Sequence, residues 1–158
     1  YAQLGYQAES GPWRNFYLTG AQDLLKKAVP YTSKLINDGV LSQMDMGTLL
    51  DYCAIQLNGE KAGGKEAVIN INFTDTKEKV MLMLKNGVLN HRLGSQDKKA
   101  DLTMEIAKMD FVKLFFGRTD LQTLRKTNKV KTTGDTKAID MIRSACEPAD
   151  PNFKIVLP

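Results

Sequence analysis

Few residues of this 158-residue chain have the types and spacing that catalysis requires. His91 is the only histidine, so the chain cannot build a metal centre from several histidines and has no separate histidine to assist a nucleophile. No Gly-x-Ser-x-Gly or comparable nucleophile motif accompanies it. We therefore interpret His91 as a strand residue that is hydrogen-bonded to a neighbour.

The acidic residues do not favour catalysis either. Asp75 with Glu78, and Asp97 with Asp101, form pairs in polar segments that are typical of turns. Carboxylates in such places are solvated and rarely act as a general acid or base. The segment from Lys61 to Lys65 (KAGGK) has the composition of a phosphate-binding loop, but it follows a predicted helix and enters a predicted strand, which is the reverse of the order that such a loop needs.

The two cysteines, Cys53 and Cys146, lie far apart in the sequence, each on the apolar face of a predicted helix. That setting favours buried free thiols over a disulfide or a metal-binding pair. Cysteine usage therefore leaves the cellular compartment undetermined.

The unusual side chains of this sequence are soft and apolar. A phenylalanine-rich segment from Lys108 to Gly117 (KMDFVKLFFG) is accompanied by five of the seven methionines, namely Met81, Met83, Met104, Met109 and Met141. Methionine is unbranched and flexible, so it lines surfaces that accept guests of varied shape. The same residues would equally fill the core of a small domain, and composition alone does not decide between the two.

The overall composition is that of a globular protein, with 42% hydrophobic and 25% charged residues and a net charge of +4. The lysines are scattered and no aromatic residues interleave with them, so we expect a solvated basic surface and no nucleic-acid site. The electrostatic field of the positive charge would still favour anionic amphiphiles. No apolar run reaches the roughly 18 residues of a membrane span, so we expect no integral span. Because the sequence begins at Tyr1, we expect it to be a piece of a longer protein.

A run of strands from Ala67 to Gly94 is the element around which the chain is organised. Apolar and polar residues alternate from Ala67 to Phe73, which places the aliphatic side chains on one face and Asn70 and Asn72 on the other. Asn86-Gly87 predicts a type I′ hairpin turn, because both residues accept a positive φ. We predict strands at residues Ala67 to Phe73, Val80 to Lys85, Val88 to Leu93, Asp101 to Ile106 and Lys129 to Thr133, the first four antiparallel in succession, with Met81 and Met83 pointing away from the aliphatic face toward a missing part of the protein.

Helical spacing and end signals predict the remaining elements. They are Tyr1 to Glu9, a helix from Pro12 that ends before Pro30, a turn at Lys34 to Asn37, Asp45 to Leu57 stopped by Asn58-Gly59, Lys108 to Gly117, a short helix opened by a Thr119 to Gln122 capping box, and Thr136 to Cys146 before an extended tail. We predict an α+β fold in which helices pack on one face of a five-stranded, mostly antiparallel sheet. Its parts would be a helical segment at residues 1–30, a linker at 31–44 and a domain at 45–158.

Six motifs tie the last of these parts, the domain at residues 45–158, to a known family. They are Leu57 to Gly59 (LNG), Ile71 to Thr76 (INFTDT), Leu84 to His91 (LKNGVLNH), Leu114 to Gly117 (LFFG), Val130 to Asp135 (VKTTGD) and Asp150 to Val156 (DPNFKIV). With these motifs in register, the region from Asp45 to Pro158 resembles a sterol carrier protein type 2-like domain.

The first residues narrow the resemblance. Gln3 to Ser10 and Pro12 to Ala21 resemble the helical segment that precedes this domain in bacterial alkylsulfatases, which hydrolyse dodecyl sulfate. The resemblance implies a longer parent enzyme with a metallo-β-lactamase-type catalytic domain holding two zinc ions, a helical region that forms a homodimer, and a periplasmic or secreted location. The His-x-His-x-Asp-His zinc motif of that domain is absent here, so we expect no cofactor and no sulfatase activity in this chain alone.

We predict that the domain binds an apolar alkyl or acyl chain and recruits substrate for the missing catalytic domain. The ligand would be a long-chain alkyl sulfate, a fatty acid or a similar amphiphile, held between the inner face of the sheet and the covering helices. The residues expected to line this site are Ile69, Ile71, Phe73, Leu82, Leu84, Leu102, Met104, Phe111, Leu114, Phe115, Leu121, Leu124, Ile139 and Ile142.

Three alternatives stay open. The domain would be a structural or dimerisation module if its own side chains fill the core. It would be a lipid carrier if it acts alone, and an independent enzyme if the metal-free chain turns over alkyl sulfate.

Overall fold

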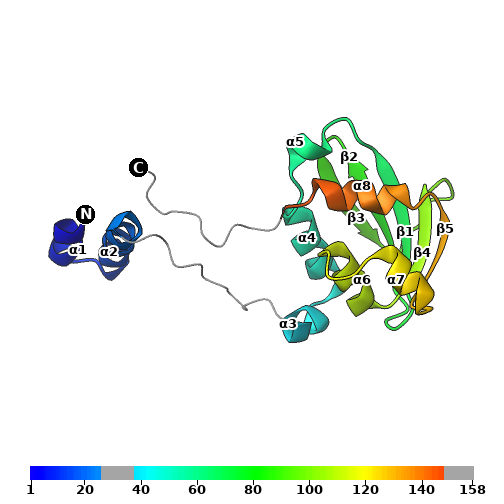
Figure 1. Cartoon of the computed structure of the whole chain (residues 1–158), viewed down its shortest axis with the longest axis horizontal. Helices are drawn as coiled ribbons and strands as arrows, with labels where there is room; N and C mark the ends of the chain where they lie inside the picture. Colours follow the sequence, from blue (N-terminus) through cyan, green and yellow to red (C-terminus); the bar gives the residue numbers. More distant parts are fainter. Residues whose placement is uncertain (26–37, 148–158) are drawn as a thin grey trace. The chain divides into compact units, whose positions relative to one another are not determined.

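The computed structural model describes residues 1–25 and 38–147 of the chain (Figure 1). The chain divides into two compact units, one of which contains residues 1–25 and the other residues 38–147. The predicted turn at residues 34–37 and the predicted tail after Pro151 lie outside the described residues. Helix α3 (Asp38–Gln43) occupies part of the segment expected as a linker, and the predicted boundaries at residues 30 and 44 stay a prediction.

The N-terminal unit is a helical hairpin. Helix α1 (Ala2–Gln7) packs closely on α2 (Gly11–Leu25), since a Cβ atom added at Gly5 would lie 2.8 Å from Cδ2 of Leu18. Two helices this short bury little surface, and Trp13 and Phe16 remain 61% and 51% exposed. The hairpin therefore presents aromatic side chains that it does not cover itself.

The second unit is built on a five-stranded sheet with the order β3-β2-β1-β4-β5. The strands are β1 (Ala67–Phe73), β2 (Lys79–Lys85), β3 (Val88–Leu93), β4 (Leu102–Ile106) and β5 (Val130–Gly134). The predicted type I′ turn is confirmed by φ values of +52° at Asn86 and +73° at Gly87. The α+β fold with a mostly antiparallel sheet is confirmed.

One strand pairing differs from the prediction. Strand β4 pairs with β1 in parallel, whereas the other neighbours are antiparallel. The connection from β3 to β4 crosses the sheet, where the side chain of Asn70 donates to the carbonyl of Asp97 at 2.7 Å and accepts from its N–H at 3.0 Å. Parallel strands cannot be joined by a tight turn and need a crossover connection of this kind. Asn70 is only 5% exposed, so this face of β1 is covered by the crossing segment.

Helices cover the other face of the sheet (Figure 1). They are α4 (Met46–Ile55), α6 (Lys108–Phe115), α7 (Leu121–Lys126) and α8 (Lys137–Ala145), with the single turn α5 (Gly59–Ala62) at the end of α4. Two predicted helix-end signals are wrong: Asn58 has a different role, and the N-terminal cap of α7 lies at a different position. Asn58 has a φ of −83° and begins α5 by accepting from the N–H groups of Glu60 and Lys61, rather than stopping α4 in a left-handed conformation.

The cap of α7 is Asp120 instead of Thr119. The Asp120 carboxylate accepts from the N–H and the hydroxyl of Thr123, each at 2.7 Å. A capping side chain must reach the N–H of the third helical residue, and Asp120 has that spacing to Thr123. Asp45 caps α4 in the same way through the N–H and hydroxyl of Thr48.

These two aspartate caps predict a loss of stability in acid. Hydrogen bonds from Thr48 lower the pKa of Asp45, and those from Thr123 lower the pKa of Asp120. The stabilisation is complete above the unfolded carboxyl pKa of about 3.9 and disappears as the pH falls through the lower pKa of the folded state. We expect urea midpoints to fall between about pH 5 and about pH 3.

The matched variant for this measurement is Asp45→Asn combined with Asp120→Asn. Asparagine caps helices as well as aspartate does but does not titrate. The double variant should keep its midpoint at pH 7 and show a shallower acid decline. Identical acid declines in the two proteins would contradict this role of the caps.

Candidate functional site

The structure brings the fourteen predicted chain-contacting residues together in one core. Each is at most 7% exposed, and all belong to a single cluster between the sheet and the helices. Phe111 of α6 meets Phe73 of β1 edge-on, with ring centroids 5.6 Å apart and planes at 88°. Phe115 extends this aromatic row from Phe111 at 5.9 Å. The assignment of the set to a bound chain stays a prediction.

The methionines on the opposite face of β2 differ from expectation in part. Met81 is only 6% exposed, so this chain already covers the side chain that we expected to face a missing part of the protein. Its neighbour Met83 is half-buried.

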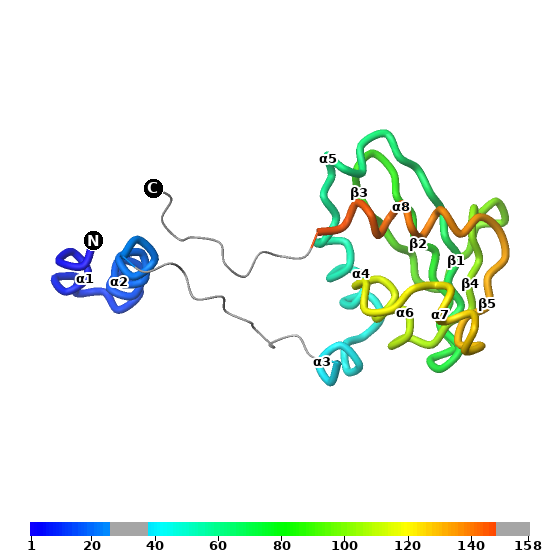
Figure 2. The backbone as a smooth tube through the Cα atoms, in the orientation of Figure 1, coloured from blue at the N-terminus to red at the C-terminus, as the bar shows by residue number. Residues whose placement is uncertain are grey.

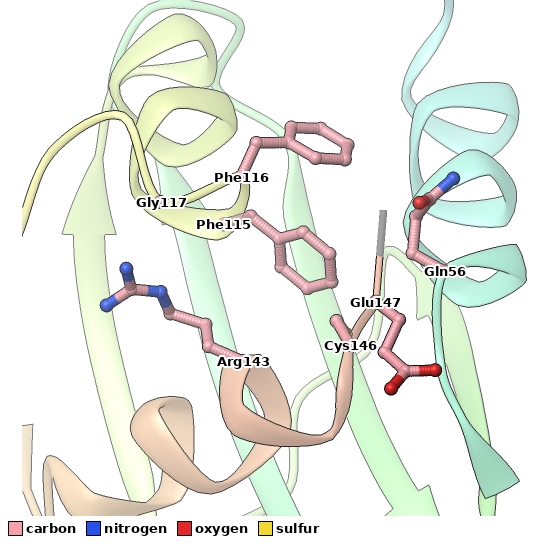
Figure 3. Close-up of a pocket in the computed structure, with 7 residues that line it drawn as sticks. All are labelled: Gln56, Phe115, Phe116, Gly117, Arg143, Cys146 and Glu147. Carbon is pink, nitrogen blue, oxygen red and sulfur yellow. The ribbon is translucent and has the colours of Figure 1, made fainter. Parts of the chain in front are cut away.

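A pocket of about 230 Å³ opens where three helices end. It is lined by Gln56, Phe115, Phe116, Gly117, Arg143, Cys146 and Glu147 (Figure 3). These residues come from the carboxyl ends of α4, α6 and α8 and from the turns that follow them. Gly117 ends α6 with a φ of +70°, a left-handed conformation that glycine adopts without strain.

Backbone hydrogen bonds hold two of these helix ends together. The N–H of Asn58 donates to the carbonyl of Ala145 at 2.9 Å, and the N–H of Glu147 donates to the carbonyl of Gln56 at 2.8 Å. Leu57 and Cys146 form an isolated antiparallel bridge between them. The path of the backbone in Figure 2 shows the end of α8 arriving beside the junction of α4 and α5. The pocket is therefore framed by fixed backbone.

The centre of the pocket is apolar and neutral. In Figure 3 the ring of Phe115 projects between Arg143 on one side and Gln56 and Glu147 on the other. Burial raises the pKa of the Cys146 thiol to about 11. Burial raises the pKa of Cys53 to about 12, with a smaller contribution from Cys146. Both cysteines are free, as predicted, but only Cys53 is buried, whereas Cys146 is half-buried and follows the end of α8 instead of lying on its apolar face. Both thiols are uncharged at neutral pH.

The two charged residues of the pocket are in different situations. The Glu147 carboxylate accepts from Nδ2 of Asn58 at 2.8 Å and pairs with Lys61, and these contacts lower its pKa. Arg143 has weaker support, since its guanidinium lies 3.6 Å from the exposed carboxylate of Asp140. Its Nε is buried and donates to no partner among the described residues. Arg143 therefore has an ion pair with Asp140, but its Nε donor is left without an acceptor among the described residues.

His91 does not take part in this site. Its Nδ1 lies 3.7 Å from a carboxylate oxygen of Asp51 in α4, which is an ion-pair distance rather than the hydrogen bond expected from the sequence. Within the described residues, no group of three or more His, Cys, Asp or Glu side chains could hold a metal ion. No helix in the described part of the chain is long and apolar enough to cross a membrane.

Sequence reasoning missed most of the pocket. Of its seven lining residues, the sequence predicts a ligand contact only for Phe115, although it also predicts helix ends at Gly117 and Cys146. The signal in the sequence that could have indicated the pocket is the set of residues that end helices. Nothing in the sequence shows that three of them meet in space, because that follows from the packing of α4, α6 and α8.

Comparison with known proteins assigns the family. The family model described as alkyl sulfatase C-terminal matches residues 34–158. The chain belongs to this alkyl sulfatase C-terminal family. The resemblance to alkylsulfatases inferred from the sequence is confirmed.

Curated and solved relatives of this alkyl sulfatase C-terminal chain agree with the assignment. A linear primary-alkylsulfatase from Pseudomonas sp. is 38% identical over 158 residues, covering 99% of this chain and 23% of the relative. An (R)-specific secondary-alkylsulfatase from Pseudomonas sp. is 36% identical over 162 residues, with the same coverage. The structure of the stereoselective inverting sec-alkylsulfatase Pisa1 from Pseudomonas sp. matches with a TM-score of 0.82 and 34% identity over 94% of this chain and 23% of that one.

The alkyl sulfatase C-terminal chain thus spans 23% of the length of these curated relatives. A sterol carrier protein 2-like structure from Aedes aegypti also matches, with a TM-score of 0.47 and 15% identity over 64% of this chain. That score is too low to carry an argument.

Proposed function

We propose that this chain binds the apolar chain of an amphiphile and recruits it for a longer alkylsulfatase, without catalysing hydrolysis itself. The observation that carries this proposal is the pocket at the ends of α4, α6 and α8. Its apolar wall of Phe115, Phe116 and neutral Cys146 continues directly into the buried core through the contact of Phe115 with Phe111.

The dimensions of the pocket fit part of an alkyl chain. Pockets that enclose drug-sized ligands measure about 300–1,000 Å³, and this one measures about 230 Å³. Each buried methylene contributes about 0.8 kcal/mol, so about five methylenes would contribute about 4 kcal/mol before ordering costs. A longer alkyl chain would need the core side chains beyond Phe115 to repack. It would then reach the core site predicted from the sequence.

The remaining functions are proposed for the longer protein as a whole. The curated relatives are named alkylsulfatases, which supports alkyl sulfate as the class of substrate. The zinc-dependent hydrolysis expected from the resemblance would belong to a separate catalytic domain. The α1–α2 hairpin would pair with a second copy of the chain, which is supported by its exposed Trp13 and Phe16.

Enlarging the side chain at position 146 should close the pocket. We expect Cys146→Leu to weaken the binding of dodecyl sulfate and Cys146→Phe to weaken it further, by about tenfold or more, because the added carbon atoms occupy the space of the ligand. Cys146→Ala leaves the space open and should bind as the parent chain does. Affinities would be measured by isothermal titration below the concentration at which micelles form.

Two controls accompany this series. Melting temperatures without ligand show whether each variant is folded, and Val88→Phe places the same ring on an exposed edge strand away from the pocket. Saturable binding by the parent chain that falls in the order alanine, leucine, phenylalanine supports the proposal. Absence of saturable binding by the parent chain, or equal binding by all three variants, would contradict it.

A structural role is the second candidate. All fourteen core residues pack against one another at no more than 7% exposure, which is the arrangement expected of a module that fills its own interior. A parent chain that neither binds dodecyl sulfate nor gains melting temperature from it would favour this role.

A further inference from the structure

The apolar pocket has one cationic side chain whose hydrogen bonds are incomplete. Among its seven lining residues, Arg143 is the only arginine or lysine. Two other arginines, by comparison, have closer partners, since Arg118 pairs with Asp38 and Arg125 donates to the hydroxyl of Thr132. The buried Nε of Arg143 has no partner among the described residues. A buried donor without an acceptor is destabilising, so this guanidinium has hydrogen-bonding capacity that the described residues leave unused.

The position of Arg143 relative to the aromatic ring defines the shape of a ligand. Its guanidinium lies on one side of Phe115 and beneath Gly117, where a Cβ atom would be 3.9 Å from Nη2 (Figure 3). The ring, Phe116 and Cys146 form the apolar wall beside it. A ligand that contacts both the apolar wall and the guanidinium has an apolar chain joined to a compact group that accepts hydrogen bonds.

The charge of that acceptor follows from the other groups in the pocket. Glu147 does not neutralise Arg143, because Asn58 and Lys61 already engage its carboxylate. Within residues 38–147, the guanidinium pairs with the exposed carboxylate of Asp140 at 3.6 Å, which lies outside the set of lining residues. Guanidinium groups bind planar or tetrahedral oxyanions through paired N–H donors, and such charge-assisted bonds are stronger than neutral ones.

Without the Arg143 guanidinium, the nearby helix ends would disfavour the binding of an anion. The carboxyl ends of α4, α6 and α8 carry partial negative charge, which disfavours an anion near the pocket. Arg143 is the cationic side chain among the lining residues that offsets this partial negative charge. Removal of this one side chain should convert the pocket from one that prefers anions into one that does not.

We infer that Arg143 binds the anionic head group of an amphiphile whose chain lies along Phe115, Phe116 and Cys146, an inference that rests on the proposed chain-binding function. Two head groups share the required chemistry, a sulfate ester and a carboxylate. Arg143 is then the residue that selects anionic over neutral amphiphiles.

The test compares three amphiphiles with the same twelve-carbon chain. Dodecyl sulfate, dodecanoate and neutral dodecyl maltoside would each be titrated into the parent chain and into Arg143→Gln, below micelle formation. Arg143→Gln should bind dodecyl sulfate about tenfold more weakly or worse and bind dodecyl maltoside within about twofold of the parent chain, as expected for loss of a charge-assisted bond. Arg143→Lys keeps the charge but loses the paired donors, so its affinity for dodecyl sulfate should lie between those of the parent chain and Arg143→Gln.

Arg92→Gln is the matched control for net charge. Arg92 is an exposed residue of β3 that does not line the pocket, so its variant should change each affinity by less than about twofold. A loss of dodecanoate binding equal to that of dodecyl sulfate supports an oxyanion site that accepts both heads, and an unchanged dodecanoate affinity supports one selective for sulfate.

The outcomes separate this inference from the proposed function. Equal effects of Arg143→Gln and Arg92→Gln, or an equal loss for all three amphiphiles, would overturn the head-group assignment while leaving chain binding intact. If the parent chain binds none of the three, dodecyl maltoside included, the chain-binding function itself fails and the head-group assignment fails with it.

Discussion

Gly134→Ala should lower the free energy of unfolding of the sheet-containing unit by about 4 kcal/mol or more, a large share of the roughly 5–15 kcal/mol that stabilises a typical domain. Gly134 has a φ of +103°, and a Cβ atom built there would lie 2.3 Å from the carbonyl oxygen of Asp101. That oxygen cannot move freely, because it accepts from the N–H of Asp135 at 2.8 Å. Alanine would force apart the end of the β4–β5 pair, where Gly134 stands opposite Leu102.

Urea unfolding followed by circular dichroism would measure this loss. Gly94→Ala is the matched control, since Gly94 also has a positive φ, +69°, but no atom lies within 4 Å of its added Cβ. Its cost should be limited to the left-handed backbone, about 1–2 kcal/mol. Equal losses at the two positions would show that the contact with Asp101 is not the cause.

Phe111→Ala should cost about 3–5 kcal/mol of stability and also weaken amphiphile binding. Phe111 is 0% exposed and contacts Phe73 of the sheet and Phe115 of the pocket wall. The cavity left by the ring would therefore loosen both the packing of α6 on the sheet and the orientation of Phe115. Unfolding in urea and titration with dodecyl sulfate would measure the two effects on the same protein.

Phe116→Ala provides the contrasting variant. Phe116 is half-buried, lines the pocket and contacts Phe115 and Tyr52 with ring centroids 5.4 and 5.5 Å away. It should lose less stability than Phe111→Ala but a comparable share of binding. A variant at Phe111 that unfolds more easily yet binds with unchanged affinity would separate the core from the pocket.

Local signals in the sequence predicted most of the elements. Period-two alternation located β1, and Asn86-Gly87 fixed the β2–β3 turn, because both depend on residues adjacent in the chain. The parallel pairing of β4 with β1 depends instead on the crossing segment held by Asn70 and Asp97. No pattern within β4 itself distinguishes a parallel from an antiparallel neighbour.

The candidate site was predicted less completely than the fold. The apolar floor followed from alternation, so residues such as Ile69 and Ile71 were placed correctly in the core. The pocket depends on Gln56, Gly117 and Arg143, which are distant in sequence and meet only when the helices pack. Arg143 lies on an otherwise ordinary amphipathic helix, and only the folded chain shows that its Nε has no partner among the described residues.

The central position of β1 has a consequence for the order in which the domain assembles. On one side β1 pairs with β2, which follows after a short turn, and on the other with β4, which is reached only after β2, β3 and the crossing segment. Short loops close with less entropy loss than long ones, so we expect the β1–β2–β3 meander to form first and α6 and α8 to dock late. The pocket then belongs to the part of the domain that closes last.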